Sequence, residues 1–326
     1  MSELHNKEMR QVYVDNLIKY ARADRRIVVI EADLMNCIGT GKFKEEFPRR
    51  FINCGIAESN MIGISAGLAS CGKLPFCSSF SPFATRRCYD QIAVSVGYTK
   101  QNVKIVGTDP GIMAQVNGGT HMSFEDVALM TQVPDMVVVE PCDCVCLEKL
   151  FPQILECDKP MYIRLQRKKT PPIYDDNAKI DLFKANTIVD GEDVTIIACG
   201  IMVHRAVTAS IMLKKDGVNA KVIAVHTYKP LDTSTILRAC HETGAVVTCE
   251  NHHLIGGLGS EVAALLMQND VLIPMTRVGI GDRYGEVGKE AYLAEVMHLT
   301  EKDIYEKAKE AFERKSKKIF NINTQN

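Results

Sequence analysis

A glutamate at the start of an apolar segment is the side chain of this sequence whose chemistry most needs an explanation. Glu58 follows Gly55-Ile56-Ala57, and the small and apolar residues of positions 59–69 predict a closely packed helix that begins near it. Burying a carboxylate is unfavourable unless another group pairs with it. The positive end of a helix dipole stabilises such a group by only about 0.3–1 kcal/mol. Glu58 is therefore either a structural residue at a helix terminus or a carboxylate that takes part in a reaction.

Two further polar side chains follow predicted strands. The apolar run 27–30 predicts a buried strand, and Asp33 stands just beyond its end. His121 closes a polar loop, 108–121, that follows the strand predicted at 103–107. Ligands of open α/β sheets bind beyond the carboxyl ends of the strands. A single histidine is more often structural, but both residues are candidates for ligand contacts.

Three aromatic residues gather after another predicted strand. Phe80, Phe83 and Tyr89 stand at and beyond the end of the run 75–80, among serine and threonine residues typical of a loop. Most aromatic side chains pack in a core. Functional side chains, however, are disproportionately found on loops. The cluster is either a packing element or the wall of a binding site.

The chain alternates predicted strands with predicted helices. This alternation is typical of parallel sheets covered on both faces, so we expect an α/β fold. A charged segment with two prolines and no periodicity divides the chain into a first domain at 1–168, a linker at 169–185 and a smaller α/β domain at 186–326. Strands are predicted at 27–30, 75–80, 103–107, 136–139, 161–165, 194–197, 221–225 and 245–248, and helices at 8–21, 58–69, 144–157 and 301–318.

Composition excludes several classes of protein. Thirty-nine Lys and Arg residues stand against 40 Asp and Glu residues, and no basic stripe of the kind that nucleic acid or an anionic membrane requires is present. The polar start lacks the apolar core of a signal peptide, and no apolar run approaches the roughly 18 residues of a membrane span. We therefore expect a cytoplasmic protein, whose 12 cysteines are reduced thiols.

Two motifs allow a ligand-binding interpretation that we do not favour. Cys142, Cys144 and Cys146 could contribute to a metal site, but no second ligand pair follows, so the cluster indicates the opening of a helix. Gly256-Gly257-Leu258-Gly259 is glycine-rich, yet the Lys-Ser or Lys-Thr of a phosphate loop is missing. It is better interpreted as a tight turn from a strand into a helix.

The sequence resembles the transketolase family of thiamine-diphosphate enzymes along essentially its whole length. The likeness implies a pyrimidine-binding domain at 1–168 and a transketolase C-terminal domain at 186–326. The motifs that carry it are Gly55-Ile56-Ala57-Glu58, Ser79 to Thr85 with Tyr89-Asp90-Gln91, Gly119-Thr120-His121, Tyr162 to Arg167, His226 to Leu231 and Ile255 to Gly259.

One part of the family pattern is missing. The Gly-Asp-Gly motif that holds Mg²⁺ and the diphosphate in the family does not occur, and the nearest sequence is Gly281-Asp282-Arg283. The resemblance therefore implies a split transketolase whose second subunit carries the diphosphate-binding domain and most of the Mg²⁺ site. No metal ligand is assigned to this chain, and the implied assembly is α2β2.

The resemblance also implies roles for the residues around the cofactor. Glu58 matches the glutamate that hydrogen-bonds ring nitrogen N1′ of thiamine diphosphate, whose own chemistry carries the reaction. Phe80, Phe83 and Tyr89 match the apolar slot around the pyrimidine. Asp33 matches a position near the cofactor and the subunit interface. Catalytic roles are implied for Glu58 and for His121, which matches a histidine that contacts substrate hydroxyl groups.

The substrate end shows both matches and departures. Arg10 and Arg167 match residues that grip a sugar phosphate, as guanidinium groups do. Asn117 replaces an aspartate that reads the hydroxyl beside the carbonyl, and Asp109 replaces a histidine on the phosphate side. Cys37 replaces a serine. Because a carboxylate repels phosphate unless a cation pairs with it, these departures leave a modified or differently charged sugar open.

The implied reaction is the transfer of a two-carbon ketol unit from a ketose to an aldose, with sugar phosphates as the usual substrates. Two other enzyme classes remain open: the beta subunit of a 2-oxoacid dehydrogenase decarboxylating component, and an enzyme similar to deoxyxylulose-phosphate synthase. A non-catalytic subunit that kept the fold is the third alternative. The motif Gly119-Thr120-His121 and the pair Arg164 and Arg167 favour a transketolase.

Overall fold

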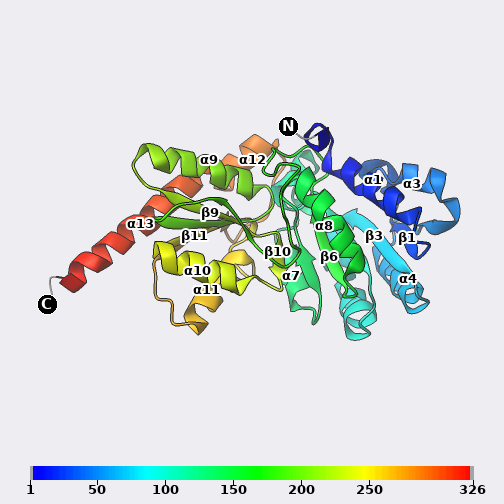
Figure 1. Cartoon of the computed structure of the whole chain (residues 1–326). Helices are drawn as coiled ribbons and strands as arrows, with labels where there is room; N and C mark the ends of the chain where they lie inside the picture. The colour runs from blue at the N-terminus through cyan, green and yellow to red at the C-terminus, as the bar shows by residue number, and fades with distance from the viewer. Residues whose placement is uncertain (1–2, 324–326) are drawn as a thin grey trace.

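Two sheets, each lying between layers of helices, make up the chain (Figure 1). The computed structural model describes residues 3–323. Within these residues, no helix is both long enough and apolar enough to cross a membrane. The α/β fold class predicted from the alternation of elements is confirmed.

The first sheet has seven strands in the order β10-β5-β6-β4-β3-β1-β2. Its pairings from β5 to β2 are all parallel, while β10 joins the edge antiparallel to β5. Buried strands of parallel sheets are apolar on both faces, which explains the unbroken apolar runs of the sequence. The strands are β1 (Ile27–Glu31), β2 (Phe51–Asn53), β3 (Leu74–Phe80), β4 (Lys104–Thr108), β5 (Val137–Val139), β6 (Met161–Leu165) and β10 (Thr227–Lys229).

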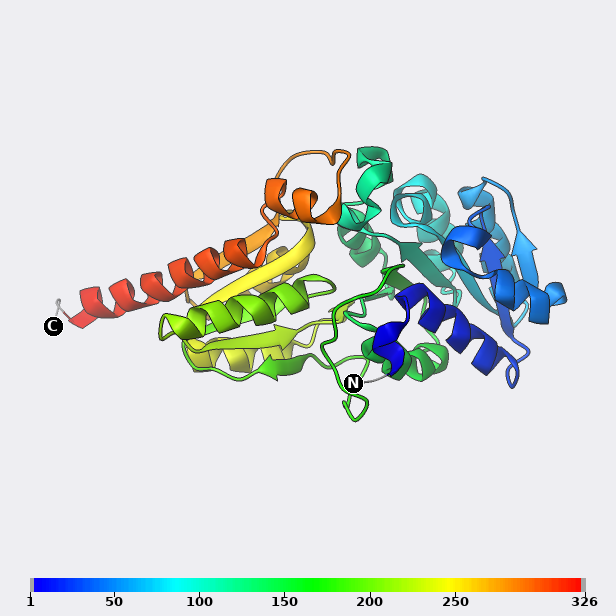
Figure 2. The same cartoon turned by 90° about the horizontal axis from the view of Figure 1, so that it is seen from above.

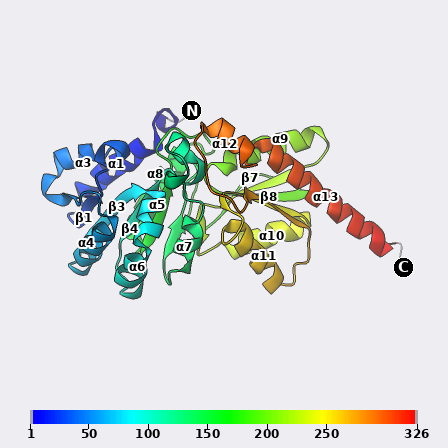
Figure 3. The same cartoon turned by 180° about the vertical axis from the view of Figure 1, so that it is seen from behind.

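Helices cover the two faces of this sheet. The side chains of α1 (Met9–Ala21) and α8 (Cys144–Glu156) belong to one apolar cluster and those of α4 (Glu58–Ser70) to the other (Figure 3). The shorter helices are η1 (Glu3–Asn6), α2 (Met35–Ile38), α3 (Gly41–Glu46), η2 (Pro48–Arg50), α5 (Ser81–Ala84), η3 (Arg86–Cys88), α6 (Tyr89–Gln91), η4 (Ile92–Tyr98), η5 (Gly111–Asn117), η6 (Gly119–His121) and α7 (Asp126–Gln132).

The cysteine cluster opens α8, as predicted. Cys144 is the first helical residue, and the side chain of Asp143 caps the helix by accepting a hydrogen bond from the backbone N–H of Cys146 at 2.7 Å. Cys142, Cys144 and Cys146 are all buried. Their thiols therefore pack in the core beneath the helix.

The second sheet has five strands in the order β12-β11-β8-β9-β7. Its strands are β7 (Asn186–Val189), β8 (Val194–Ala198), β9 (Ala220–Ala224), β11 (Val246–His253) and β12 (Met275–Ile280). Its helices are α9 (Met202–Lys215), α10 (Thr233–Thr243), α11 (Leu258–Gln268), α12 (Glu290–Val296) and α13 (Glu301–Asn323). The first part of α13 packs on the second sheet, and Figure 2 shows the C-terminal end of this helix projecting beyond it.

The glycine-rich motif is a turn from β11 into α11, as predicted. The backbone N–H groups of Leu258 and Gly259 donate to the two carboxylate oxygens of Glu250, at 2.7 and 2.9 Å. Gly256 adopts φ +76°, a conformation that favours glycine. Because a buried carboxylate already uses the free N–H groups of this helix start, they are not available to a phosphate.

The segment between the two sheets is packed, although it contains no helix or strand between residues 166 and 185. The backbone N–H groups of Ile173 and Tyr174 donate to Asp143 at 2.8 and 2.9 Å, and Ile180 and Leu182 are buried. Strand β10 then returns from the second half of the sequence to the first sheet. The predicted domain limits at 168 and 186 stay predictions.

A buried arginine joins the two halves of the molecule. Arg164 of β6 is fully buried and donates to Asp126 at 2.8 Å and to Glu140 at 3.0 Å. It also donates to the backbone oxygen of Asn251 on β11 at 2.7 Å. One guanidinium thus compensates two buried carboxylates and contacts the second sheet.

Another buried carboxylate lies at the end of β1. Glu31 accepts a hydrogen bond from the Thr40 hydroxyl at 2.9 Å, and its second oxygen has no hydrogen-bond partner among residues 3–323. Burial raises the pKa of Glu31 to about 8. This side chain is therefore a neutral acid at pH 7, which lowers the cost of burying it.

Replacing Arg164 by alanine should lower the free energy of unfolding by roughly 3–5 kcal/mol, because Asp126 and Glu140 would remain buried without their cation. Urea unfolding followed by circular dichroism measures the change. Arg22→Ala, which breaks an exposed pair with Glu46, is the matched control and should leave the unfolding midpoint unchanged. A similar, small effect of both substitutions would contradict the structural role of Arg164.

Glu31→Gln should remove a pH dependence of stability. With a folded-state pKa of about 8 and an ordinary pKa in the unfolded chain, Glu31 favours the folded state fully below pH ~4.5, and this contribution is lost as pH rises through 8. The free energy of unfolding of the wild type should fall, relative to the variant, by up to ~1.4 kcal/mol per pH unit in this window. Urea titrations at pH 5.5, 7 and 8.5 check this. The exposed control Glu45→Gln should run parallel to the wild type.

Candidate functional site

The candidate site lies at the carboxyl edge of the first sheet. Asp33 follows β1, Phe80 ends β3, Asp109 follows β4 and Arg167 follows β6. Because these strands are parallel, the four residues stand at the same edge. Asp33 and Asp109 both adopt a left-handed backbone conformation, with φ of 61° and 52°. Aspartate tolerates this conformation better than most residues, which suits it to a sharp turn after a strand.

Glu58 is the first residue of α4, and its side chain is only 3% exposed. Gly55, with φ +69°, turns the chain between β2 and this helix. The Glu58 carboxylate accepts a hydrogen bond from Nη1 of Arg87 at 2.9 Å. The sequence-based prediction of a buried carboxylate at a helix start is therefore confirmed, and Arg87 is its partner.

Phe80, Phe83 and His121 come together near Arg87, whose guanidinium pairs with Glu58 and lies over the Phe83 ring. Their ring centroids are 6.1 Å apart for the two phenylalanines, and His121 lies 5.8 Å from Phe80 and 5.1 Å from Phe83 in edge-on contacts. A cavity of about 500 Å³ opens here, lined by Pro82, Phe83, Arg86, Arg87, Thr120 and His121. The aromatic loop thus faces a cavity rather than only a core.

Tyr89 is placed differently from the other two aromatics. It lies on α6, is half-buried, and packs against the apolar cluster that includes the α4 side chains. It is not among the residues that line the cavity of Phe83 and His121. Its predicted contact with the cofactor stays a prediction.

Arg10 and Arg167 are neighbours through their backbones, because the N–H of Arg10 donates to the carbonyl of Arg167 at 3.2 Å. Each guanidinium already has a carboxylate. Arg10 donates to Glu8 at 2.7 Å and to the backbone oxygen of Cys37 at 2.7 Å. Arg167 forms an ion pair with Asp109. Burial raises the pKa of Asp109, and the Arg167 guanidinium opposes that shift.

The remaining predicted residues lie on exposed loops. Asn117 ends η5 and is exposed, and Asp33 is exposed and linked to Asn53, whose side chain accepts from the Asp33 N–H at 3.1 Å. Gln115, two residues before Asn117, adopts φ 50° and accepts from Lys168 at 3.4 Å. The loop carrying Asn117 is therefore held in a strained conformation beside Arg167.

Sequence reasoning missed Glu8, Arg86 and Arg87. Arg86 donates to Glu125 at 2.8 Å and to the carbonyl of Thr120 at 3.2 Å, which ties the aromatic loop to the loop of His121. Two adjacent arginines in a loop near a predicted buried acid were a signal for the Glu58 partner. Nothing in the sequence indicated which arginine it would be, because the choice depends on the turn of η3.

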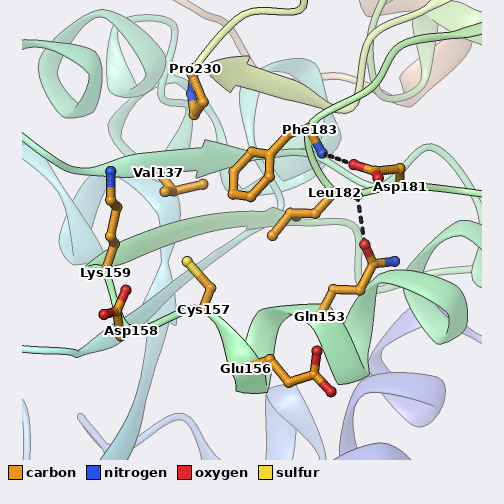
Figure 4. A pocket seen from close by; sticks show the side chains of 10 residues that line it. All are labelled: Val137, Gln153, Glu156, Cys157, Asp158, Lys159, Asp181, Leu182, Phe183 and Pro230. Atoms are coloured by element: carbon orange, nitrogen blue, oxygen red, sulfur yellow. Dashed lines mark hydrogen bonds between the residues drawn. The ribbon is translucent and has the colours of Figure 1, made fainter.

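A second cavity, also about 500 Å³, lies at the opposite edge of the sheet, where α8 ends and β6 begins (Figure 4). Gln153 there accepts from the N–H of Leu182 at 2.8 Å, and Cys157 and Phe183 face the same space. None of the predicted site residues lines it. Residues 3–323 hold no group of three or more His, Cys, Asp or Glu side chains that could hold a metal ion.

Comparison with known proteins identifies the family of this chain. The family model of the transketolase pyrimidine-binding domain matches residues 5–172, and that of the transketolase C-terminal domain matches residues 183–304. The chain is 49% identical to the 6-deoxy-6-sulfo-D-fructose transketolase subunit SqwH of Clostridium sp. (strain MSTE9), over 96% of this chain and 97% of that protein.

Two further comparisons cover nearly whole chains as well. One of the subunits of the apulose-4-phosphate transketolase of Phocaeicola vulgatus is 38% identical over 84% of this chain and 87% of its own length. A solved structure described as a split gene transketolase, an inactive beta4 tetramer, superposes with a TM-score of 0.85 at 36% identity, covering 94% of this chain and 99% of that one. The chain therefore belongs to the transketolase family, of which it carries the pyrimidine-binding and C-terminal domains.

Proposed function

We propose that this chain is the C-terminal subunit of a split transketolase, which transfers a two-carbon ketol unit from a ketose to an aldose. The observation that carries the proposal is the buried Glu58 carboxylate, which Arg87 links to the ring of Phe83 and so to the neighbouring imidazole of His121. In this proposal, Glu58 is the acid, Phe83 is the apolar wall for the cofactor ring, and His121 is the polar contact for the substrate. The chain lacks a metal-binding cluster within residues 3–323.

The residues present fit the pyrimidine half of thiamine diphosphate. A planar heteroaromatic ring needs an apolar wall, which Phe83 offers, and a carboxyl group for its ring nitrogen, which Glu58 offers. When bound, thiamine diphosphate supplies the nucleophilic carbon to which the ketose carbonyl adds. Glu58 would hold a proton at the ring nitrogen N1′, and its small contact with water would strengthen that hydrogen bond.

The other residues of this half-site orient the sugar. His121, whose Nδ1 lies 3.0 Å from the Thr120 hydroxyl, directs its second ring nitrogen to a substrate hydroxyl. Asn117 and Asp33 follow strands β4 and β1 at the same edge of the sheet, and we assign Asn117 to the substrate and Asp33 to the cofactor. The diphosphate and Mg²⁺ are assigned mainly to a partner subunit, in an α2β2 assembly. Two relatives are named transketolase subunits, which supports a division of the enzyme between two chains.

The charge at the substrate end favours a singly charged sugar terminus. The two arginines assigned to the anion are each paired with a carboxylate, Arg10 with Glu8 and Arg167 with Asp109. Such a site carries less positive charge for a phosphate dianion than two free arginines would. A sulfonate, which carries one charge, fits this balance better. One relative acts on 6-deoxy-6-sulfo-D-fructose according to its name, and we propose a terminal sulfonate for this chain as well.

Ketol transfer is favoured over the alternative reactions of related enzymes. Decarboxylation of a 2-oxoacid and a pyruvate-dependent synthase reaction use the same cofactor. The names of two relatives that this chain matches over most of its length specify transketolase subunits. Pyruvate offered to the reconstituted complex should therefore not be consumed.

Glu58→Gln should lower ketol transfer by roughly 10²–10⁴-fold in the reconstituted two-subunit complex, the range typical of a lost proton-transfer group. Steady-state assays with a ketose donor and an aldose acceptor measure the loss. The control Glu313→Gln alters an exposed carboxylate of α13 and should retain full turnover. Undiminished turnover of the Glu58 variant would support a non-catalytic subunit instead.

Asp109→His should shift donor preference from the sulfonate toward the phosphate, because Arg167 would lose its permanent carboxylate. We expect the ratio of kcat/KM for 6-deoxy-6-sulfofructose to kcat/KM for fructose 6-phosphate to fall by about tenfold, which corresponds to ~1.4 kcal/mol. The wild-type ratio should also fall near pH 5.5, where a phosphate ester carries one charge.

The exposed Asp176→His is the matched control for this substitution, and its ratio should equal that of the wild type. A wild-type complex that prefers the phosphate at neutral pH would refute the sulfonate assignment. Ketol transfer itself would stand in that case.

A further inference from the structure

One guanidinium makes both contacts that the proposed function assigns to the cofactor ring. Arg87 donates from Nη1 to the Glu58 carboxylate at 2.9 Å. Its central carbon lies 3.8 Å from the centroid of the Phe83 ring, so the planar group lies over the aromatic face. Both Phe83 and Arg87 line the cavity.

A guanidinium and an aminopyrimidine resemble one another in the features that matter here. Both are flat and delocalised, carry N–H groups at their edge, and lie against aromatic faces. We propose that Arg87 holds the place of the pyrimidine ring in the cofactor-free subunit and leaves it when thiamine diphosphate enters. This inference depends on the proposed function and adds a residue that governs cofactor affinity.

The cofactor-free chain has a physical need for such a group. Glu58 is 3% exposed, and an ionised carboxylate with so little contact to water is unfavourable unless a cation or several donors satisfy it. Among residues 3–323, Arg87 is the cation that forms an ion pair with Glu58. Its charge therefore stabilises the pocket before a ligand is present.

Arg87 can also leave at modest cost. Its side chain is 45% exposed, and its contacts with Glu58 and Phe83 are made by the tip of a long side chain that can rotate into water. The adjacent Arg86 differs, because it is tied to Glu125 and to the carbonyl of Thr120 on another loop. The two neighbouring arginines thus have different roles. Arg86 ties its loop to the loop of His121, and Arg87 occupies the cavity beside Phe83.

The consequence for binding follows from competition. When only a fraction of the protein is in the binding-competent state, the apparent dissociation constant equals the intrinsic one divided by that fraction. Thiamine diphosphate must displace the guanidinium before its ring can meet Glu58. Removing Arg87 should therefore tighten cofactor binding, and the same substitution should destabilise the cofactor-free subunit.

The test measures binding in the reconstituted complex by titration calorimetry with thiamine diphosphate and Mg²⁺. For Arg87→Ala we expect the Kd to fall about tenfold relative to the wild type. Arg49→Ala, which removes an exposed arginine elsewhere, is the control and should leave the Kd unchanged. An unchanged or larger Kd for Arg87→Ala would overturn the inference and make Arg87 either neutral or a permanent contact of the cofactor.

A second readout needs no cofactor. In the free subunit, Arg87→Ala should lower the urea midpoint at pH 7, and the same substitution in a Glu58→Gln background should have a much smaller effect. Equal effects in both backgrounds would also overturn the inference. A wild-type complex that binds no thiamine diphosphate, while the two stability effects still differ, would instead refute the proposed function.

Discussion

The buried guanidinium of Arg164 is the interaction on which the relative placement of the two sheets depends. It compensates Asp126 and Glu140 and holds the backbone of Asn251 on β11. The Asn251 side chain then accepts from the N–H of Ile112 at 3.1 Å and donates to the carbonyl of Pro110 at 3.0 Å. Through this chain of contacts the second domain sets the course of the loop that follows Asp109. A buried cation between the sheets thereby supports the substrate end of the proposed site.

Charge compensation within the chain is the common feature of the candidate site. Arg87 pairs with Glu58, Arg167 with Asp109 and Arg10 with Glu8. Glu58 and Asp109 are buried, and a half-site that exists before its partner and cofactor arrive cannot leave such carboxylates without counterions. The pairing also reduces the free positive charge that these three arginines present. In the proposed assembly, the metal and the partner subunit supply what the diphosphate needs.

Local sequence patterns predicted the elements that have strong apolar runs, and they missed elements defined by pairing. The strands β1, β3, β4 and β6 are buried along their whole length and could be recognised from composition alone. Strands β2, β7, β10 and β12 were not predicted. The side chains of β7 are half-exposed or exposed, so its residues form no apolar run. Strand β10 has only three residues and pairs with β5, which is distant in the sequence. Pairing between such distant segments leaves no periodic signal in either one.

The amino-acid sequence by itself determined the α/β class, the burial of Glu58 at a helix start, and the family, because these depend on apolar periodicity and on short contiguous motifs. It also placed Phe80, Phe83 and His121 at or beyond the carboxyl ends of strands, where ligands of such sheets bind. Only the tertiary structure decided which charged groups meet: Arg87 rather than Arg86 reaches Glu58, and Asp109 pairs with Arg167. The tertiary structure also decided that Tyr89 packs against the apolar cluster that contains side chains of α4. Side chains from different loops meet where the backbone turns direct them, and those directions are set by long-range packing that no local pattern records.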